Sequence, residues 1–315
     1  MLKVENFNDE ISKKVETPEL KNYVKISIEN DEKNFCVLTK KFVDTNYLNR
    51  LRDFKVHDDD VWVISYPKCG TTWGVEMIWL LINDLNFEKA KKIHQNDRVP
   101  FIERGGIFTS INSDSIKITE NLKRPRVIKS HLSSFLLPRE LFANTKAKII
   151  YIARNPKDAA ISFFHHYRHL EGYDGSKEDF LNAFLNNRTL FAPINEKTLE
   201  FWKLSKINSN VLFIFYEDMK KNLQNETEKV MKFLNKNYPK SEIEELCEHL
   251  SFGSMRRNPQ CNFEVINKSD DENFQFIRKG ETGSYKKEMN SEENEKFDDF
   301  IMNEDFKFND FEYKF

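Results

Sequence analysis

The chain has 315 residues, 32% of them charged, and a formal net charge of −2, so it has no overall electrostatic attraction for nucleic acid or for an anionic membrane. Its longest uninterrupted apolar run, residues 77–82, is far too short to span a bilayer. We therefore expect neither nucleic acid nor a membrane as partner, and we expect any basic binding site to be local.

The cysteines and the N-terminus indicate the compartment. Cys36, Cys69, Cys247 and Cys261 show no paired spacing, which is typical of a reducing environment. The first residues contain an acidic side chain and no apolar core, unlike a signal peptide. These features predict a cytoplasmic protein.

The N-terminal part of the chain is polar before it becomes periodic. Residues 1–22 are rich in charge, which predicts a solvated or loosely docked arm. Residues Tyr23–Ile28 alternate with period two and predict a strand at a sheet edge. Residues 42–54 have a helical pattern, and a polar turn over residues 57–60 follows.

Residues 61–73, Val-Trp-Val-Ile-Ser-Tyr-Pro-Lys-Cys-Gly-Thr-Thr-Trp, are the most informative stretch. A β-branched apolar run ends at Lys68 and Gly70, and residues 73–82 are apolar on nearly every side, which predicts a buried strand, a tight turn and a buried helix. Such a turn directs backbone N–H groups and the helix dipole at one point. With the charge of Lys68 and the hydroxyls of Thr71 and Thr72, it predicts a P-loop-like phosphate-binding turn. An ordinary strand–turn–helix corner with a surface lysine is the alternative.

This turn differs from that of the nucleoside triphosphatases, in which a glycine lies five positions before a Gly-Lys-Ser/Thr triplet. Here Lys68 precedes Gly70, and Ser65 occupies the position of the first glycine. A P-loop kinase or NTPase is therefore kept only as an alternative.

Residues 66–73, Tyr-Pro-Lys-Cys-Gly-Thr-Thr-Trp, closely resemble the signature of the cytosolic sulfotransferases, with cysteine where serine is usual. In that family the loop binds the 5′-phosphosulfate of 3′-phosphoadenosine 5′-phosphosulfate (PAPS). The resemblance implies that PAPS is bound by Lys68, Cys69, Gly70, Thr71, Thr72 and Trp73.

Residues 126–132 predict a second strand that ends in polar residues, and the carboxyl edge of a parallel sheet is where α/β proteins bind their ligands. The family has Lys-Thr-His-Leu-Pro at this point. The resemblance implies that His131 is the general base and that Lys129 is retained, whereas Ser133 replaces the proline. From the residues alone, a lone histidine such as His131 is more often a structural residue than a catalyst.

Residues 148–153 predict a third strand, which is followed by Arg154 where a triphosphatase would carry a metal-binding aspartate. The arginine indicates a second anion site; a pair with a surface carboxylate is the alternative. In the family, Arg-Asn-x-Lys-Asp and a serine eight residues after the arginine bind the 3′-phosphate, which implies Arg154 and Ser162. The Arg-Lys-Gly motif of Arg278, Lys279 and Gly280 resembles the other half of that site.

Three further segments resemble parts of the family's pockets. Tyr216, at the end of a strand predicted over residues 211–218, matches a tyrosine that reaches the nucleotide. Phe252 and Met255 match residues at the adenine, although Leu250 replaces a threonine. Phe101 matches an aromatic residue of the acceptor pocket. Packing in the core is the alternative for Phe101, Phe252 and Met255.

The remaining segments are mainly helical. Residues 172–206, 227–234 and 241–250 have helical spacing, and residues 258–273 lack periodicity and predict a long loop, a candidate lid. His165 and His169 are four residues apart on one predicted helix, but no acidic or cysteine partner accompanies them at the spacing of a zinc motif, so we expect no metal.

Strands alternate with helices and no linker divides the chain, which predicts a single α/β domain over residues 23–315 around a central parallel sheet flanked by helices. The resemblance implies transfer of a sulfuryl group from PAPS to a hydroxyl or amine of a small hydrophobic acceptor, with His131 as base and Lys68 and Lys129 stabilising charge. A non-catalytic carrier of small apolar ligands is a second alternative. Asn290 and Ser291 replace the Thr-Val centre of the family's dimerisation motif, so we expect a monomer or a dimer built elsewhere.

Overall fold

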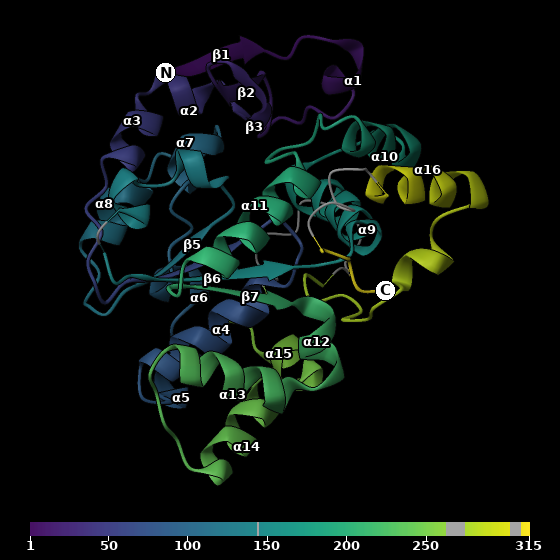
Figure 1. Cartoon of the computed structure of the whole chain (residues 1–315). Helices are drawn as coiled ribbons and strands as arrows, with labels where there is room; N and C mark the ends of the chain where they lie inside the picture. Colours follow the sequence, from purple (N-terminus) through teal and green to yellow (C-terminus); the bar gives the residue numbers. More distant parts are fainter. Residues whose placement is uncertain (144, 263–274, 303–309) are drawn as a thin grey trace.

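The computed structural model describes residues 1–143, 145–262, 275–302 and 310–315 (Figure 1). Most of the candidate lid predicted over residues 258–273 lies outside these ranges. Within them, no helix is both long and apolar enough to cross a membrane.

A four-stranded parallel sheet forms the centre of the molecule. Its order is β5 (Val127–Ser130), β4 (Val61–Ser65), β6 (Lys148–Ala153) and β7 (Val211–Phe215). Ile64 of β4 lies opposite Ser130 of β5, and Ser65 lies opposite Ile152 of β6. The strands therefore end together, and the segments that follow β4, β5 and β6 meet at one edge. The predicted α/β domain with a central parallel sheet is confirmed.

Helices cover both faces of this sheet (Figure 1). One face carries α4 (Thr71–Ile82), α13 (Leu223–Phe233) and α14 (Lys240–His249). The other carries α9 (Pro156–His166), α10 (Lys177–Leu185), α11 (Ile194–Ile207) and α16 (Ser291–Ile301).

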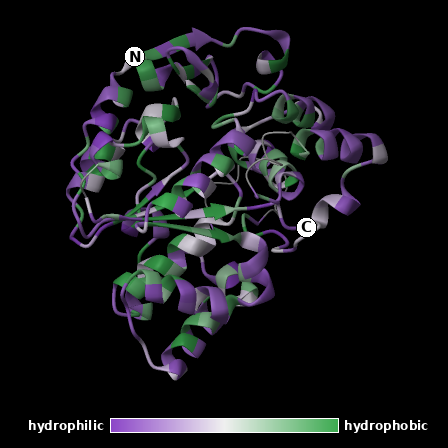
Figure 2. Ribbon diagram, in the orientation of Figure 1, coloured by the Kyte–Doolittle hydropathy of each residue, from purple (hydrophilic) through white to green (hydrophobic). Residues whose placement is uncertain are grey.

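The strand side chains alternate between two hydrophobic cores, and Figure 2 shows the apolar strands and inner helix faces together. Trp62 and Ile64 of β4 belong to the core beneath α9 and α11, whereas Val61 and Val63 belong to the core beneath α4. Each fully buried side chain of this size contributes about 1.5–3 kcal/mol. Burial on both faces explains why the strands are apolar at nearly every position.

The N-terminal segment differs from the prediction. β1 (Leu2–Asn6), β2 (Tyr23–Ile28) and β3 (Asp31–Thr39) form an antiparallel sheet in the order β1-β2-β3. The expectation of a solvated or loosely docked arm is wrong for this segment, and β2 is the central strand rather than an edge strand. The side chains of β1 are largely exposed while its backbone pairs with β2, so polar composition concealed the strand.

Two other boundaries also differ. The helix predicted over residues 42–54 is divided into α2 (Lys41–Asp44) and α3 (Tyr47–Arg52), because Asn46 between them has a left-handed backbone with φ of 56°. The strand predicted over residues 211–218 ends at Phe215, and α12 (Tyr216–Lys221) begins at the next residue with acidic side chains in its first turn.

The remaining elements are short. They are α1 (Glu10–Lys13), α5 (Phe87–Lys92), α6 (Gln95–Arg98), α7 (Arg104–Ile107), α8 (Ser115–Glu120), α15 (Phe252–Arg257), the 3₁₀ turns Ser134–Leu136, Arg139–Phe142 and Ser284–Lys287, and a π-helical turn over Tyr167–Glu171.

Candidate active site

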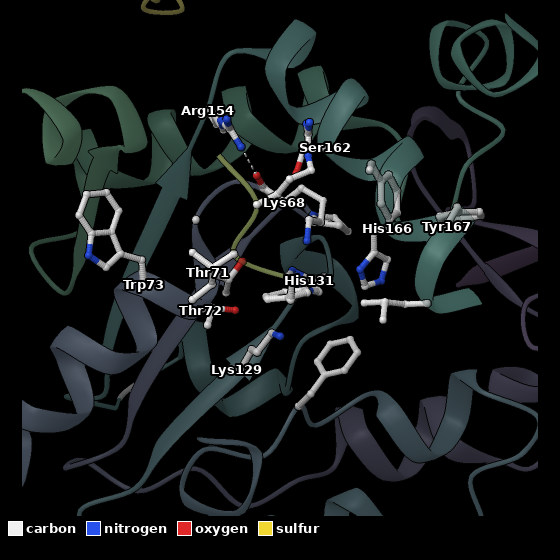
Figure 3. A pocket seen from close by; sticks show the side chains of 18 of the residues that line it. Lys68, Thr71, Thr72, Trp73, Lys129, His131, Arg154, Ser162, His166 and Tyr167 are labelled. Carbon is white, nitrogen blue, oxygen red and sulfur yellow. Dashed lines mark hydrogen bonds between the residues drawn. The ribbon is translucent and has the colours of Figure 1, made fainter. Parts of the chain in front are cut away.

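A cavity of about 420 Å³ opens where the parallel strands end (Figure 3). Every residue predicted for the site lines this cavity except Cys69. The lining residues among them are Lys68, Gly70, Thr71, Thr72, Trp73, Phe101, Lys129, His131, Arg154, Ser162, Tyr216, Phe252, Met255, Arg278, Lys279 and Gly280. The side chain of Cys69 lies in the hydrophobic core, where burial raises the pKa of its thiol to about 12.

The phosphate-binding turn has an unusual backbone. Lys68 and Gly70 have φ angles of 66° and 91°, in the left-handed region. A Cβ on Gly70 would lie 2.6 Å from the ring of Tyr216, so this position requires glycine. The carbonyl of Lys68 accepts a hydrogen bond of 2.9 Å from Nη1 of Arg154. The turn is therefore held by residues that follow three different strands, β4, β6 and β7.

The side chain of Lys68 lies in a cationic and desolvated environment. Burial and the charges of Lys129, Arg154 and Arg278 lower the pKa of its amine to about 7. Its Nζ atom is 3.9 Å from the centre of the Phe276 ring. Because like charges and burial both disfavour the ammonium form of Lys68, an anion bound at this turn would stabilise that form.

Arg154 offers a hydrogen-bond donor to such an anion. Nη2 of Arg154 donates to the carbonyl of Glu281 at 3.1 Å, and its guanidinium lies 4.3 Å from the centre of the Tyr216 ring. Its Nε atom is buried and has no hydrogen-bond partner in the part of the chain that the structure describes. Ser162, from α9, lies near Arg154 in Figure 3. A phosphate fits this arrangement, since it would accept from the unpaired Nε.

Arg278 and Lys279 enter the same cavity from the C-terminal part of the chain. Nη1 of Arg278 and Nζ of Lys279 bind one carboxylate oxygen of Glu288, at 3.0 and 2.7 Å. Burial raises the pKa of Glu288, but the hydrogen bonds from His165 and Lys279 and the charge of Arg278 outweigh it and hold that pKa well below its usual range.

Phe252, one of the residues predicted for the adenine, lies beside Gly280. The φ of Gly280 is 60°, and a Cβ there would lie 2.3 Å from the ring of Phe252. The glycine thus permits close packing of the Arg-Lys-Gly turn on Phe252.

His131 follows β5 and has a defined tautomer. Its Nδ1 atom is 2.8 Å from the carbonyl oxygen of Ser65, which can only accept, so Nδ1 carries the proton and Nε2 carries the lone pair. Burial, followed by the charge of Lys129, lowers the pKa of His131 well below its ordinary value. Its ring packs against Phe101 and Phe191, with ring centres 5.1 and 5.3 Å apart. A neutral imidazole with an accepting Nε2 has the properties of a general base.

Two buried charged residues fix the backbone around His131. The carboxylate of Glu103 accepts from the hydroxyl of Ser130 and, at 3.0 Å, from the amide of His131. Nζ of Lys197, on α11, donates to the carbonyls of His131 and Phe191 at 2.5 and 2.8 Å. The sequence gives no indication of a role for Glu103 or Lys197, because a charged residue on an expected loop or helix carries no signal of its burial.

The cavity is also lined by residues that sequence reasoning missed. They are Glu19 and Leu20 from the N-terminal segment, Phe108, Ser110 and Ile111 after α7, His166, Tyr167, Leu170 and Glu171 at the end of α9 and in the π-helical turn, and Leu190 and Phe191 before α11. Glu19 and Leu20 gave no signal, because residues 1–22 were expected to stand apart from the domain.

The histidines of α9 and the following turn do not gather into a ligand set. His165 binds Glu288 through Nε2 at 2.6 Å, and His166 pairs with Glu171. Over the described ranges, no three His, Cys, Asp or Glu side chains are arranged to hold a metal ion.

Comparisons with known proteins agree with this geometry. The sulfotransferase domain family matches residues 58–309. The amine sulfotransferase of Oryctolagus cuniculus is 36% identical over 286 residues, 89% of this chain and 91% of that protein. The luciferin sulfotransferase of Photinus pyralis is 34% identical over 81% of this chain and 74% of its own length.

Solved structures extend the comparison to the whole chain. Retinol dehydratase in complex with retinol and 3′-phosphoadenosine 5′-phosphate (PAP) has a TM-score of 0.88 and 25% identity, over 99% of each chain. A mouse sulfotransferase complexed with PAP has a TM-score of 0.67 and 27% identity, over 86% of this chain and 93% of that one.

The chain belongs to the sulfotransferase family, and its activity is sulfuryl transfer. Family membership confirms the resemblance seen in the phosphate-binding turn. It decides against the P-loop kinase or NTPase and against the non-catalytic carrier.

Proposed function

We propose that this enzyme transfers the sulfuryl group of PAPS to a hydroxyl, or an amine, of a small hydrophobic acceptor, with His131 as the general base. The observation that carries this proposal is the tautomer of His131. Its Nδ1 atom donates to the carbonyl of Ser65, so the basic Nε2 is available in the cavity that Lys68 and Arg154 also line.

Binding of PAPS is assigned to two groups of residues. The turn from Lys68 to Trp73 would receive the 5′-phosphosulfate, and Arg154, Ser162 and the Arg278–Gly280 turn would receive the 3′-phosphate. The unpaired Nε of Arg154 supports the 3′-phosphate site, because a phosphate oxygen would accept its hydrogen bond. The lowered pKa of Lys68 supports the 5′-phosphosulfate site, because a bound anion would favour the ammonium form of the lysine.

The chemistry requires positioning and charge stabilisation more than covalent help. Nε2 of His131 takes the proton of the acceptor hydroxyl as the new oxygen–sulfur bond forms and the bond from sulfur to the phosphate oxygen breaks. Lys68 stabilises the charge left on that phosphate, and Lys129 neutralises the sulfuryl oxygens. No step of this scheme calls for a metal ion. The base contributes about 10²–10⁴-fold to the rate.

The acceptor is expected to be largely apolar. Phe101 and Phe191 pack against His131, and Phe108 and Leu190 also line the cavity. These apolar side chains favour hydrophobic phenols or alcohols over carbohydrates. The cysteines are free thiols, which supports the cytoplasm as the compartment.

Two experiments test the proposal. PAP should stabilise the fold against heat more than adenosine 5′-phosphate does, in the absence of metal, and equal stabilisation would contradict the 3′-phosphate site. Labelled PAPS should transfer sulfate to small phenols or alcohols rather than to oligosaccharides.

The role of His131 is tested by His131→Ala, which should lose most of kcat while the affinity for PAP stays nearly constant. A parallel loss of PAP binding would show that the histidine is structural.

A further inference from the structure

The basic side chains at the nucleotide end of the cavity are partly neutralised by the protein itself. Arg154, Arg278 and Lys279 carry one positive charge each and line the cavity. Arg278 and Lys279 both donate to the same carboxylate oxygen of Glu288, at 3.0 and 2.7 Å. The proposed function assigns the two basic residues to the 3′-phosphate and gives Glu288 no role.

The backbone of Glu288 is held in place by two other charged side chains. Asp158 of α9 accepts from the amides of Gly283 and Tyr285, at 2.7 and 3.1 Å, and so anchors the 3₁₀ turn that precedes Glu288. Nζ of Lys177, on α10, donates to the carbonyl of Glu288. The carboxylate is therefore a fixed part of this end of the cavity rather than a mobile surface group.

The side chain of Glu288 is ionised at neutral pH. It is 18% exposed, and burial raises its pKa, but the hydrogen bonds from His165 and Lys279 and the charge of Arg278 hold that pKa well below its usual range. Its second oxygen lies 2.6 Å from Nε2 of His165, so both oxygens are bonded. A full negative charge thus lies in contact with two of the three cations assigned to the 3′-phosphate.

This carboxylate brings the charge of the site close to that of its ligand. The three cations less the one carboxylate leave a net charge of about +2, and a phosphate monoester carries about −1.5 to −2 at pH 7. Without Glu288 the same cations would present about +3. They would then attract the phosphate more strongly, because Coulomb energy grows with the product of the charges.

We infer that Glu288 sets the affinity of the enzyme for the 3′-phosphate, weakening it enough for the product PAP to be released. The carboxylate repels the phosphate and draws on the same two donors, Arg278 and Lys279. Affinity differences between related complexes lie mostly in the dissociation rate, so removal of this charge slows the departure of PAP. The inference rests on the proposed function, since it concerns the 3′-phosphate site of the same reaction.

The test compares PAP with adenosine 5′-phosphate, which lacks the 3′-phosphate. The Kd of each is measured by calorimetry, and the dissociation rate of PAP is measured by stopped-flow displacement. Glu288→Gln removes the charge but keeps the shape and an amide oxygen that accepts hydrogen bonds. This variant should bind PAP about tenfold more tightly than wild type and release it about tenfold more slowly. Its affinity for adenosine 5′-phosphate should stay within about twofold.

Glu292→Gln is the matched control. Glu292 is exposed on α16, pairs with Lys296 and does not line the cavity, so the variant loses the same charge from the same part of the chain. It should bind both nucleotides as wild type does. A second variant, Glu288→Thr, removes the charge with a shorter side chain and should also bind PAP more tightly. Urea unfolding without nucleotide checks that each variant is folded.

The inference is overturned if Glu288→Gln binds PAP no more tightly than wild type, because the carboxylate would then only hold the two basic side chains in place. It is also overturned if PAP and adenosine 5′-phosphate gain affinity equally, since the charge would then not act on the 3′-phosphate. Failure of the proposed function has another signature: the wild-type enzyme would bind PAP and adenosine 5′-phosphate equally well.

Discussion

Lys68 should make nucleotide binding strongly dependent on pH. In the free enzyme burial, Lys129, Arg154 and Arg278 lower the pKa of its amine to about 7, from an ordinary value of 10.5. The amine is therefore mostly neutral above pH 7, although an ammonium is needed to bind phosphate. The bound phosphates should raise its pKa again, so PAP binding takes up a proton at alkaline pH.

The magnitude follows from the titration. With a pKa of about 7, about half of the free enzyme carries the Lys68 charge at pH 7 and about 1% carries it at pH 9. The Kd for PAP should rise about 50-fold across this interval, equivalent to about 2.3 kcal/mol. The phosphate of the nucleotide has its second pKa at about 6, so the change above pH 7 belongs to the protein.

Calorimetry in buffers of different ionisation enthalpy measures both the Kd for PAP and the number of protons taken up on binding. At pH 8 binding should take up about 0.9 proton from Lys68. Lys68→Met should weaken binding at pH 7 and remove most of this uptake. Lys117→Met, at an exposed lysine of α8 that does not line the cavity, is the control and should keep the uptake. A Kd that is constant from pH 7 to 9, or proton uptake that survives Lys68→Met, would refute the reasoning.

Three other predictions concern the phosphate-binding turn, a buried ion pair and the oligomeric state. Gly70→Ala should lower the free energy of unfolding in urea by about 1–3 kcal/mol and weaken PAP binding, because the residue has a positive φ and its new Cβ would lie 2.6 Å from Tyr216. Gly172→Ala is the control for the backbone effect alone, since Gly172 has φ of 74° and a nearest contact of 3.8 Å, and it should retain PAP affinity. Arg98→Met should cost about 3–5 kcal/mol in the same assay, since Arg98 lies 2.8 Å from the buried carboxylate of Glu76, and a loss below about 1 kcal/mol would contradict a buried ion pair. Light scattering should find a monomer, or a dimer that Glu295→Lys leaves intact, and dissociation by this variant would reveal the family's dimer contact.

Much of the central architecture could be read from local patterns. β6 has the bounds expected from its apolar run, and α4 begins two residues before its expected start because Gly70 caps the helix from the left-handed region. Parallel strands buried on both faces leave a strong signal, since each position must be apolar. The phosphate-binding turn was equally visible, because its chemistry is carried by adjacent residues.

The rest depended on contacts between distant segments. β1 was concealed because most of its side chains are exposed and its pairing with β2 is through the backbone. The burial of Lys197, which holds the carbonyl of His131, and the partnership of Glu171 with His166 cannot be read from a pattern of charged residues. The pKa of Lys68 likewise results from charges on three other segments and from exclusion of water. The sequence by itself determined the strands of the central sheet and the donor chemistry of the phosphate site. Only the tertiary structure decided which charges are buried together, because desolvation and Coulomb energy depend on distances that sequence separation does not measure.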